Sequence, residues 1–206
     1  MSRAERIYDW WGRHPKLYRT TSVQSPAVRR ERAFSRLDLS AGEKVLEMGC
    51  GPGVNFEPLR NAVGPTGTVV GLDFSAEMVQ QATRLIRDYN WSNVHAVRGD
   101  ATQAGLASDT FDAVIAPLAL STMPNVQRAL ENIQDALRPN GRLVVVELDV
   151  FQEGLLQLLN PLYRRFMKYV FGRQLDTDVL TKLQGAFETV DVETFDYGSS
   201  WVALAE

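Results

Sequence analysis

The chain has 206 residues, of which 45% are hydrophobic and 23% charged, and its formal net charge is −3. This composition is that of one globular domain with a single core, and no apolar run approaches the ~20 residues that span a bilayer. A single cysteine, Cys50, excludes an internal disulfide, and the N-terminus carries no apolar secretory stretch. We therefore expect one cytoplasmic domain over residues 1–206.

The charges are unevenly distributed along the chain. Residues 1–40 hold nine Arg or Lys and four Asp or Glu, a balance of +5, so the remaining residues sum to −8. A basic arm of this kind attracts an anionic membrane surface or an acidic partner. A solvated helical surface explains the same charges, and composition alone favours that explanation.

Strand-like and helix-like segments alternate after a helical N-terminal region. That region is predicted to run to about Leu37, with Pro26 starting its second segment. Short apolar runs typical of parallel strands predict five strands, over residues 44–48, 68–72, 94–97, 111–116 and 143–148. Helical stripes predict helices between Gly53 and Gly64, over 76–88 with Ser75 as N-cap, and over about 126–137. This alternation indicates a doubly wound α/β sheet.

The pattern changes near the end of this alternation. The residues Arg138-Pro139-Asn140-Gly141 are predicted to interrupt regular secondary structure before the fifth strand. Residues 151–172 form an apolar, basic-edged helical stretch interrupted by Pro161, and residues 188–195 and 200–205 predict a terminal antiparallel hairpin. The helical stretch is expected to determine substrate identity. It lines an apolar acceptor pocket, rests on a membrane surface, or only covers the sheet.

The most informative motif is the glycine turn at the end of the first strand. The sequence Gly49-Cys50-Gly51-Pro52-Gly53 follows that strand, and Asp73 ends the next one. A glycine turn that opens a helix brings backbone N–H groups close to a ligand, because no Cβ intervenes. An acid at the neighbouring strand tip accepts the hydroxyls of a ribose. Together these residues predict a site for a nucleoside cofactor.

The glycine spacing and a nearby acid indicate which nucleoside binds. Dinucleotide folds use GxGxxG and hold a pyrophosphate, whereas this turn is GxGxG with Glu47 two residues before it. A carboxylate there repels a pyrophosphate and suits a cationic amino group. The turn resembles motif I of the class I S-adenosylmethionine (SAM)-dependent methyltransferases, and Asp73 resembles their ribose-binding acid. The resemblance covers about residues 41–206 and implies SAM as cofactor and a seven-stranded, mostly parallel sheet with a reversed last strand.

The resemblance also implies further cofactor contacts. Gly99-Asp100-Ala101 resembles the third contact, in which Asp100 takes the adenine amino group and the following backbone N–H reaches the ring. Phe74 is expected against the adenine face with Met78 one turn on, and core packing is the alternative for both. No metal is expected. The expected cofactor-binding residues are Glu47, Gly49, Cys50, Gly51, Gly53, Asp73, Phe74, Met78, Asp100, Ala101 and Pro117.

The segment after the fourth strand concerns the acceptor. Residues 111–117 resemble motif IV, but Ala116-Pro117-Leu118-Ala119 lacks the side-chain acceptor and the aromatic ring that base methyltransferases use, which argues against a nucleic-acid acceptor. Residues 118–124 and 137–143 resemble the methyltransferases of quinone biosynthesis and the phospholipid N-methyltransferases (methyltransferase type 11). In one departure, Ser121-Thr122 stands where the quinone enzymes have Arg-Asn. The resemblance implies a small lipophilic acceptor, with peripheral membrane contact left open.

Methyl transfer from a sulfonium is an in-line displacement that requires alignment and exclusion of water. A general base is needed only where the acceptor must lose a proton. Tyr8, in Tyr8-Asp9-Trp10-Trp11, resembles the element that folds over the cofactor, and His14 is the candidate base if that lid closes. We thus expect a helical lid over 1–40, a SAM-binding core over 41–150 and a substrate side over 151–206.

Three other functions are compatible with parts of the sequence. The basic arm suggests nucleic-acid methylation, and the glycine turn is also compatible with a non-catalytic SAM-binding module. A nicotinamide-dependent reductase is the least favoured, because the glycine spacing differs from that of dinucleotide folds.

Overall fold

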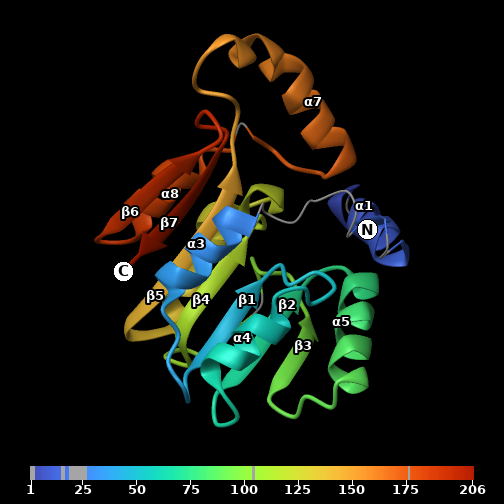
Figure 1. The fold of residues 1–206 in the computed structure, drawn as a ribbon, viewed down its shortest axis with the longest axis vertical. Helices are drawn as coiled ribbons and strands as arrows, with labels where there is room; N and C mark the ends of the chain where they lie inside the picture. The colour runs from blue at the N-terminus through green and yellow to red at the C-terminus, as the bar shows by residue number, and fades with distance from the viewer. Residues whose placement is uncertain (1–2, 15–16, 19–26, 104, 176) are drawn as a thin grey trace.

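The computed structural model describes residues 3–14, 17–18, 27–103, 105–175 and 177–206, and these form an α/β protein built on one sheet (Figure 1). Within these residues the sheet has seven strands in the order β3-β2-β1-β4-β5-β7-β6. Strands β1 to β5 are mutually parallel, and β7 is antiparallel to both of its neighbours. The strands are β1 (Lys44–Met48), β2 (Thr68–Asp73), β3 (Val94–Arg98), β4 (Phe111–Pro117), β5 (Leu137–Leu148), β6 (Val190–Phe195) and β7 (Ser200–Ala205). The predicted fold class is confirmed.

Helices cover both faces of this sheet. They are α1 (Arg3–Arg13), α3 (Ala27–Leu37), α4 (Phe56–Val63), α5 (Ala76–Asp88), α6 (Val126–Ala136), α7 (Asn160–Val170) and α8 (Val179–Ala186), with the 3-10 turns η1 (Leu120–Thr122) and η2 (Leu155–Leu159). Alternate residues of β1 point to opposite cores: Val45 packs with α3, α4 and α5, and Leu46 packs with α6 and α8. Among the described residues, no helix is long and apolar enough to cross a bilayer.

A third, smaller core joins α1, α5 and α7 at the carboxyl ends of the strands (Figure 1). The Trp11 ring of α1 stacks on Phe171, with 5.7 Å between centroids, and its indole N–H donates to the carbonyl of Val170 at 3.1 Å. The Ser75 hydroxyl accepts from the Met78 N–H as the predicted N-cap of α5 and donates to the Asp9 carboxylate at 2.6 Å. These contacts hold α1 across the end of the sheet that carries the glycine turn.

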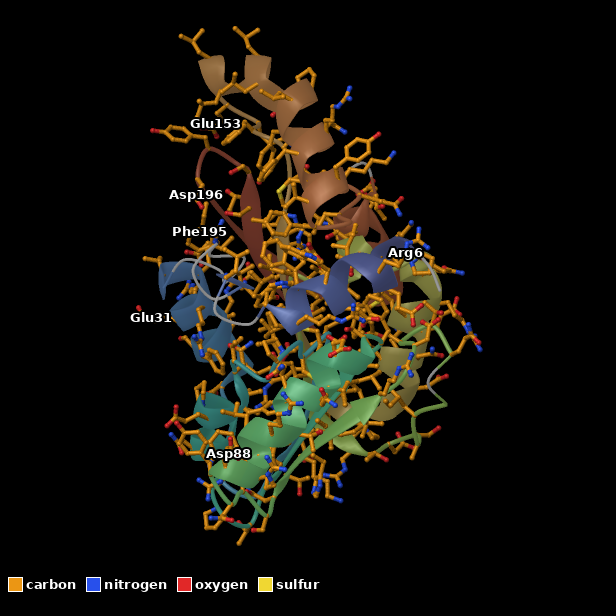
Figure 2. All side chains as sticks on the ribbon, turned by 90° about the vertical axis from the view of Figure 1, so that its right-hand side faces the viewer. Arg6, Glu31, Asp88, Glu153, Phe195 and Asp196 are labelled. Atoms are coloured by element: carbon orange, nitrogen blue, oxygen red, sulfur yellow. The ribbon has the colours of Figure 1, made fainter. Side chains whose placement is uncertain are left out.

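Three of the four arginines on α3 have acidic partners in the C-terminal hairpin, whereas Arg30 donates to the carbonyl of Val54. Arg29 pairs with Asp196 at 2.8 Å and Arg36 pairs with Asp191 at 3.0 Å. Figure 2 shows Glu31 of α3 on the same side of the molecule as Phe195 and Asp196. The carboxylate of each pair is exposed to solvent, and such pairs contribute little to stability, typically ~0–1 kcal/mol each. They do neutralise part of the arm within the chain itself, whereas Lys16, Arg19 and Pro26 lie outside the described residues.

Three local expectations differ from the structure. The predicted break at residues 138–141 is wrong, because these residues belong to β5, which bulges there: Asn140 has φ +64° and the pairing with β4 shifts register. Pro161 does not interrupt a helix but stands in the first turn of α7, where its missing N–H has no intrahelical partner to lose. Helix α8 was not expected. It has only two turns, begins at the N-cap Asp178, and buries just Val179 and Leu183.

Candidate functional site

A cavity of about 520 Å³ lies at the carboxyl ends of the parallel strands. It is at the point where the strand order reverses, since β1 has β2 on one side and β4 on the other. Open α/β sheets bind their ligands at this position, because the loops on the two sides diverge there and leave a crevice. Residues from the ends of β1, β2, β3 and β4 line it, together with residues of α1 and α3. Its size suits a small organic ligand.

The cavity gathers most of the residues expected at a cofactor site. Its wall includes Tyr8, Glu47, Gly49, Cys50, Gly51, Asp73, Phe74, Asp100, Ala101 and Pro117. Among the described residues, no group of three or more His, Cys, Asp or Glu side chains is placed to hold a metal ion.

Three expected residues lie outside the cavity wall. A Cβ at Gly53 would meet the Phe56 ring at 2.7 Å, so this glycine allows α4 to pack closely. Met78 is buried in the small core with Trp11, the packing role that was its alternative. His14 is exposed, and its Nδ1 lies 2.8 Å from the carbonyl oxygen of Trp10. The structure thus separates the candidate base from the other site residues.

Asp73 connects the second strand to the glycine turn. Its buried carboxylate accepts hydrogen bonds from the backbone N–H groups of Gly51 at 2.8 Å and Ser75 at 2.9 Å. Burial raises the pKa of Asp73 to about 6, although the two backbone hydrogen bonds act in the opposite direction. Each carboxylate oxygen has a further lone pair, so the group retains capacity for the two hydroxyls of a ribose.

The turn itself requires glycine at its first position. Gly49 has φ +70°, a left-handed conformation, and a Cβ there would lie 2.6 Å from the Cβ of Ala119 in the loop after β4. The loops after β1 and β4 therefore approach each other more closely than any larger residue permits.

Glu47 presents an unsatisfied acceptor at the cavity. Its side chain is 1% exposed; Oε1 accepts from Asn55 Nδ2 at 2.6 Å, and Oε2 has no hydrogen-bond partner among the described residues. Burial raises the pKa of Glu47 to about 8, against the effects of Asn55 and Arg30. A buried acceptor without a partner is unfavourable, and a ligand that supplies a charged donor removes the penalty. The residues present therefore fit a cofactor with a cationic amino group, as SAM has.

Asp100 accepts hydrogen bonds from its own loop, which follows β3. Its Oδ1 accepts from both the backbone N–H and the hydroxyl of Thr102, at 2.9 and 2.7 Å, and its Oδ2 lies 3.3 Å from Gln103 Nε2. These hydrogen bonds show that Asp100 forms a turn, whether or not it also contacts an adenine. Asp100 and Ala101 also line the cavity, so both remain accessible to a ligand bound there.

A buried ion pair beside the cavity was not anticipated. Arg173 and Glu147 are each 1% exposed, and Arg173 Nη1 lies 3.2 Å from Glu147 Oε2 and 3.0 Å from the Ser121 hydroxyl. Its Nη2 donates to the carbonyl of Leu118, whereas Nε has no partner among the described residues. Burial raises the pKa of Glu147, opposed by Arg173 and by hydrogen bonds from Ser121. Arg173 itself lines the cavity.

Two tyrosines lie in the same wall as Arg173. Tyr8 meets Phe74 edge to face, with 5.7 Å between ring centroids, and Tyr18 also borders the cavity. Burial raises the pKa of both phenols, and the charge of Arg173 acts to lower it. The loop after β4 adds small and apolar side chains to the cavity wall: Leu118, Ala119, Met123 and Pro124. The cavity is therefore acidic beside the glycine turn and apolar, with one buried cation, beside the loop after β4.

Comparisons with known proteins agree with this geometry. Residues 39–184 match the family model of a methyltransferase domain. Curated relatives include the demethylmenaquinone methyltransferases of Staphylococcus saprophyticus, 26% identical over 200 residues that span 95% of this chain and 83% of that protein, and of Staphylococcus aureus, 28% identical over 185 residues that span 90% and 74%.

Solved structures share the fold. SAM-dependent methyltransferases from Aquifex aeolicus and Mesorhizobium loti superpose with TM-scores of 0.66 and 0.68 at 18% and 19% identity. The first comparison spans 85% of this chain and 87% of that structure, and the second spans 87% and 97%. With the family model matching well over half of its residues, the chain belongs to the methyltransferase domain family and is a SAM-dependent methyltransferase.

Proposed function

We propose that this enzyme transfers the methyl group of SAM to a small lipophilic acceptor that presents an oxygen to Arg173. The observation that carries this proposal is the division of the cavity. Acidic side chains gather at the glycine turn, whereas the wall formed by the loop after β4 is apolar. Arg173 also lines the cavity, and its Nε has no hydrogen-bond partner among the described residues.

The donor half of the site is assigned to the residues around the glycine turn. Glu47 Oε2 accepts from the cofactor's amino group, and Asp73 accepts from the ribose hydroxyls. Asp100 and the backbone of Ala101 hold the adenine edge, with Phe74 against its face. Bound SAM supplies an electrophilic methyl group together with its own leaving group. The chain therefore contributes binding, alignment and exclusion of water, for which proximity alone accounts for roughly 7–11 kcal/mol of barrier.

In the part of the cavity assigned to the acceptor, the positive charge of Arg173 stabilises negative charge on the acceptor oxygen. A buried guanidinium at a cavity wall stabilises an oxygen that carries negative charge, because its surroundings screen the interaction weakly. Arg173 would thereby lower the pKa of a hydroxyl acceptor, so that its proton passes to water and the anion attacks the methyl group while S-adenosylhomocysteine leaves. The raised pKa of Tyr8 keeps its phenol protonated at neutral pH, so Tyr8 serves as a hydrogen-bond donor rather than as a base. With His14 outside the cavity wall, this scheme uses no side-chain base.

A quinol or related phenol is the acceptor class that fits best. Its apolar ring suits the small side chains after β4, and its acidic hydroxyl suits Arg173. The relatives named for demethylmenaquinone support the same class. The amine nitrogen of a phospholipid gains no nucleophilicity from a nearby cation, and a nucleic acid would compete with hairpin acids for the α3 arginines.

Transfer of labelled methyl from SAM tests the proposal. Reduced quinols, simple phenols, phosphatidylethanolamine, thiols and oligonucleotides are offered separately at equal concentration. We expect label in the quinol or phenol products. Label found only in the amine lipid or the oligonucleotide contradicts the proposal, and SAM binding without transfer to any acceptor identifies a non-catalytic module instead.

A further inference from the structure

The segment from Leu155 to Tyr169 exposes an unusual amount of apolar surface. Half of the large hydrophobic side chains that are exposed among the described residues belong to it, with Leu155 and Leu158 86% and 80% exposed. These side chains define the α7 apolar face: Leu155, Leu158, Leu159, Leu162, Phe166 and Tyr169. Contiguous apolar surface of this kind marks an interaction site on a folded protein.

Folding accounts for only one side of α7. Tyr163, Met167 and Val170 turn inward and pack in the small core with α1. Leu162, Phe166 and Tyr169 are spaced four and three residues apart, so they form a second stripe on the outer side of the same helix. The inner stripe attaches α7 to the enzyme, and at least half of each side chain in the outer stripe remains exposed.

The charge of this segment is one-sided. Residues 154–175 contain no Asp or Glu, although the whole chain carries 25 of them and has a net charge of −3. Arg165 and Lys168 are exposed on α7, and the Arg165 guanidinium lies 5.6 Å from the centre of the Tyr169 ring. Basic side chains beside an apolar helical stripe complement an anionic lipid surface, where the ammonium and guanidinium groups meet headgroups and the apolar side chains enter the acyl boundary.

The position of the segment suits a planar partner. Helix α7 and the η2 turn project beyond the body of the protein in two views at right angles (Figure 1; Figure 2). The C-terminal end of α7 contacts α1, because Trp11 donates to the carbonyl of Val170. Helix α1 also supplies Tyr8 to the cavity wall. A lipid surface against the outer stripe would therefore lie close to the lid of the active site.

We propose that the α7 apolar face docks this enzyme on the surface of an anionic lipid bilayer, with the helix lying in the interface. This inference concerns a surface separate from the cavity, and it stands whether or not the acceptor is a quinol.

Flotation with vesicles of phosphatidylcholine alone, or with phosphatidylglycerol added, tests the proposal on the full chain. Wild-type protein is expected to float with the anionic vesicles and to dissociate as salt is raised. The variant Leu158→Glu/Leu162→Glu is expected to bind at least tenfold more weakly. Arg165→Gln/Lys168→Gln is expected to lose roughly fivefold for each basic side chain. Val28→Glu is the matched control, because it places the same acid at an exposed apolar position on α3 and should bind as wild type.

Two results would overturn the inference. One is equal vesicle binding by wild type and by the Leu158→Glu/Leu162→Glu variant. The other is absence of binding by wild type, together with a dimer in sedimentation that this variant converts to monomer, which would assign the face to a second copy of the chain. SAM affinity measured for every variant verifies that each one is folded, since these side chains lie outside the cavity wall.

Discussion

The Asp73 carboxylate accepts a hydrogen bond from the Gly51 N–H at 2.8 Å, so the tip of β2 is fastened to the turn that follows β1. The same carboxylate accepts from Ser75 at the start of α5. Three chain segments thus converge on one buried acid. The position assigned to the ribose is therefore organised before the cofactor arrives, which reduces the entropy lost on binding.

Replacement of Asp73 tests that organisation. Asp73→Ala removes the partner of two backbone N–H groups and of the ribose hydroxyls, and hydrogen bonds to a charged group are worth about 1.5–3 kcal/mol each. We expect SAM affinity measured by isothermal titration to fall about 100-fold or more. Asp73→Asn keeps one acceptor oxygen and should give an intermediate loss. Unchanged affinity in a folded Asp73→Ala protein would refute the assignment.

Glu47→Gln is expected to stabilise the empty enzyme at high pH while weakening cofactor binding. Burial raises the pKa of Glu47 from 4.5 to about 8, so its proton contributes stability that is fully present below pH 4.5 and lost as pH rises through 8. Each pKa unit corresponds to about 1.4 kcal/mol, so the shift of about 3.5 units allows a gain of up to about 5 kcal/mol at pH 9. Glutamine still accepts from Asn55 but offers no charge to an ammonium group.

Thermal unfolding of both proteins at pH 5 and pH 9 measures this effect. The difference in Tm should be large at pH 9 and small at pH 5. The same difference at both pH values would mean that Glu47 is ionised throughout and that its assigned environment is incorrect.

Two variants should separate the contribution of Arg173 to stability from its contribution to methyl transfer. Arg173→Met leaves Glu147 buried without a cation, which typically costs about 3–5 kcal/mol of stability. Arg173→Met/Glu147→Gln removes that charge and should recover most of the stability. Methyl transfer by the double variant should still be slower by roughly 100- to 1,000-fold, the effect of losing one donor to a developing oxyanion.

Two further measurements test the role of Arg173 in methyl transfer itself. SAM affinity of the double variant should equal that of wild type, and its kcat/KM for a phenolic acceptor should rise toward higher pH than in wild type, because the acceptor must lose its proton unaided. Full activity with an unchanged pH profile would restrict Arg173 to a structural role.

Ser75 is expected to couple the lid to the cofactor helix. Ser75→Ala removes the N-cap of α5 and the hydrogen-bond donor to buried Asp9, for a loss of about 1–3 kcal/mol in urea unfolding. Hydrogen exchange should increase in α1. Thr83→Ala, an exposed change on the same helix, is the control and should alter stability by no more than about 0.5 kcal/mol. Equal effects of the two substitutions would argue against the coupling.

Local patterns predicted the parts of the molecule that local interactions determine. The glycine turn, Glu47 and Asp73 are encoded within short segments, because a parallel strand, a turn and a helix N-terminus each have their own residue preferences. The Ser75 cap and the start and end of α5 follow from the same kind of signal. These features predicted most of the residues that line the acidic part of the cavity.

The parts that were missed depend on contacts between distant segments. Arg173 meets Glu147 and Ser121 only after α7 has crossed the end of the sheet, and no motif around it signals burial. The two apolar stripes of α7 look alike in sequence, although only one is covered. Met78 satisfied the spacing for a site residue, but α1 lies over it and makes it part of a core.

A crystal structure of the complex with S-adenosylhomocysteine would locate the cofactor site. We expect the amino group of the ligand within hydrogen-bond distance of Glu47 Oε2 and both ribose hydroxyls at the Asp73 carboxylate. A ligand bound outside this cavity, or a ribose held by a residue other than Asp73, would contradict that expectation.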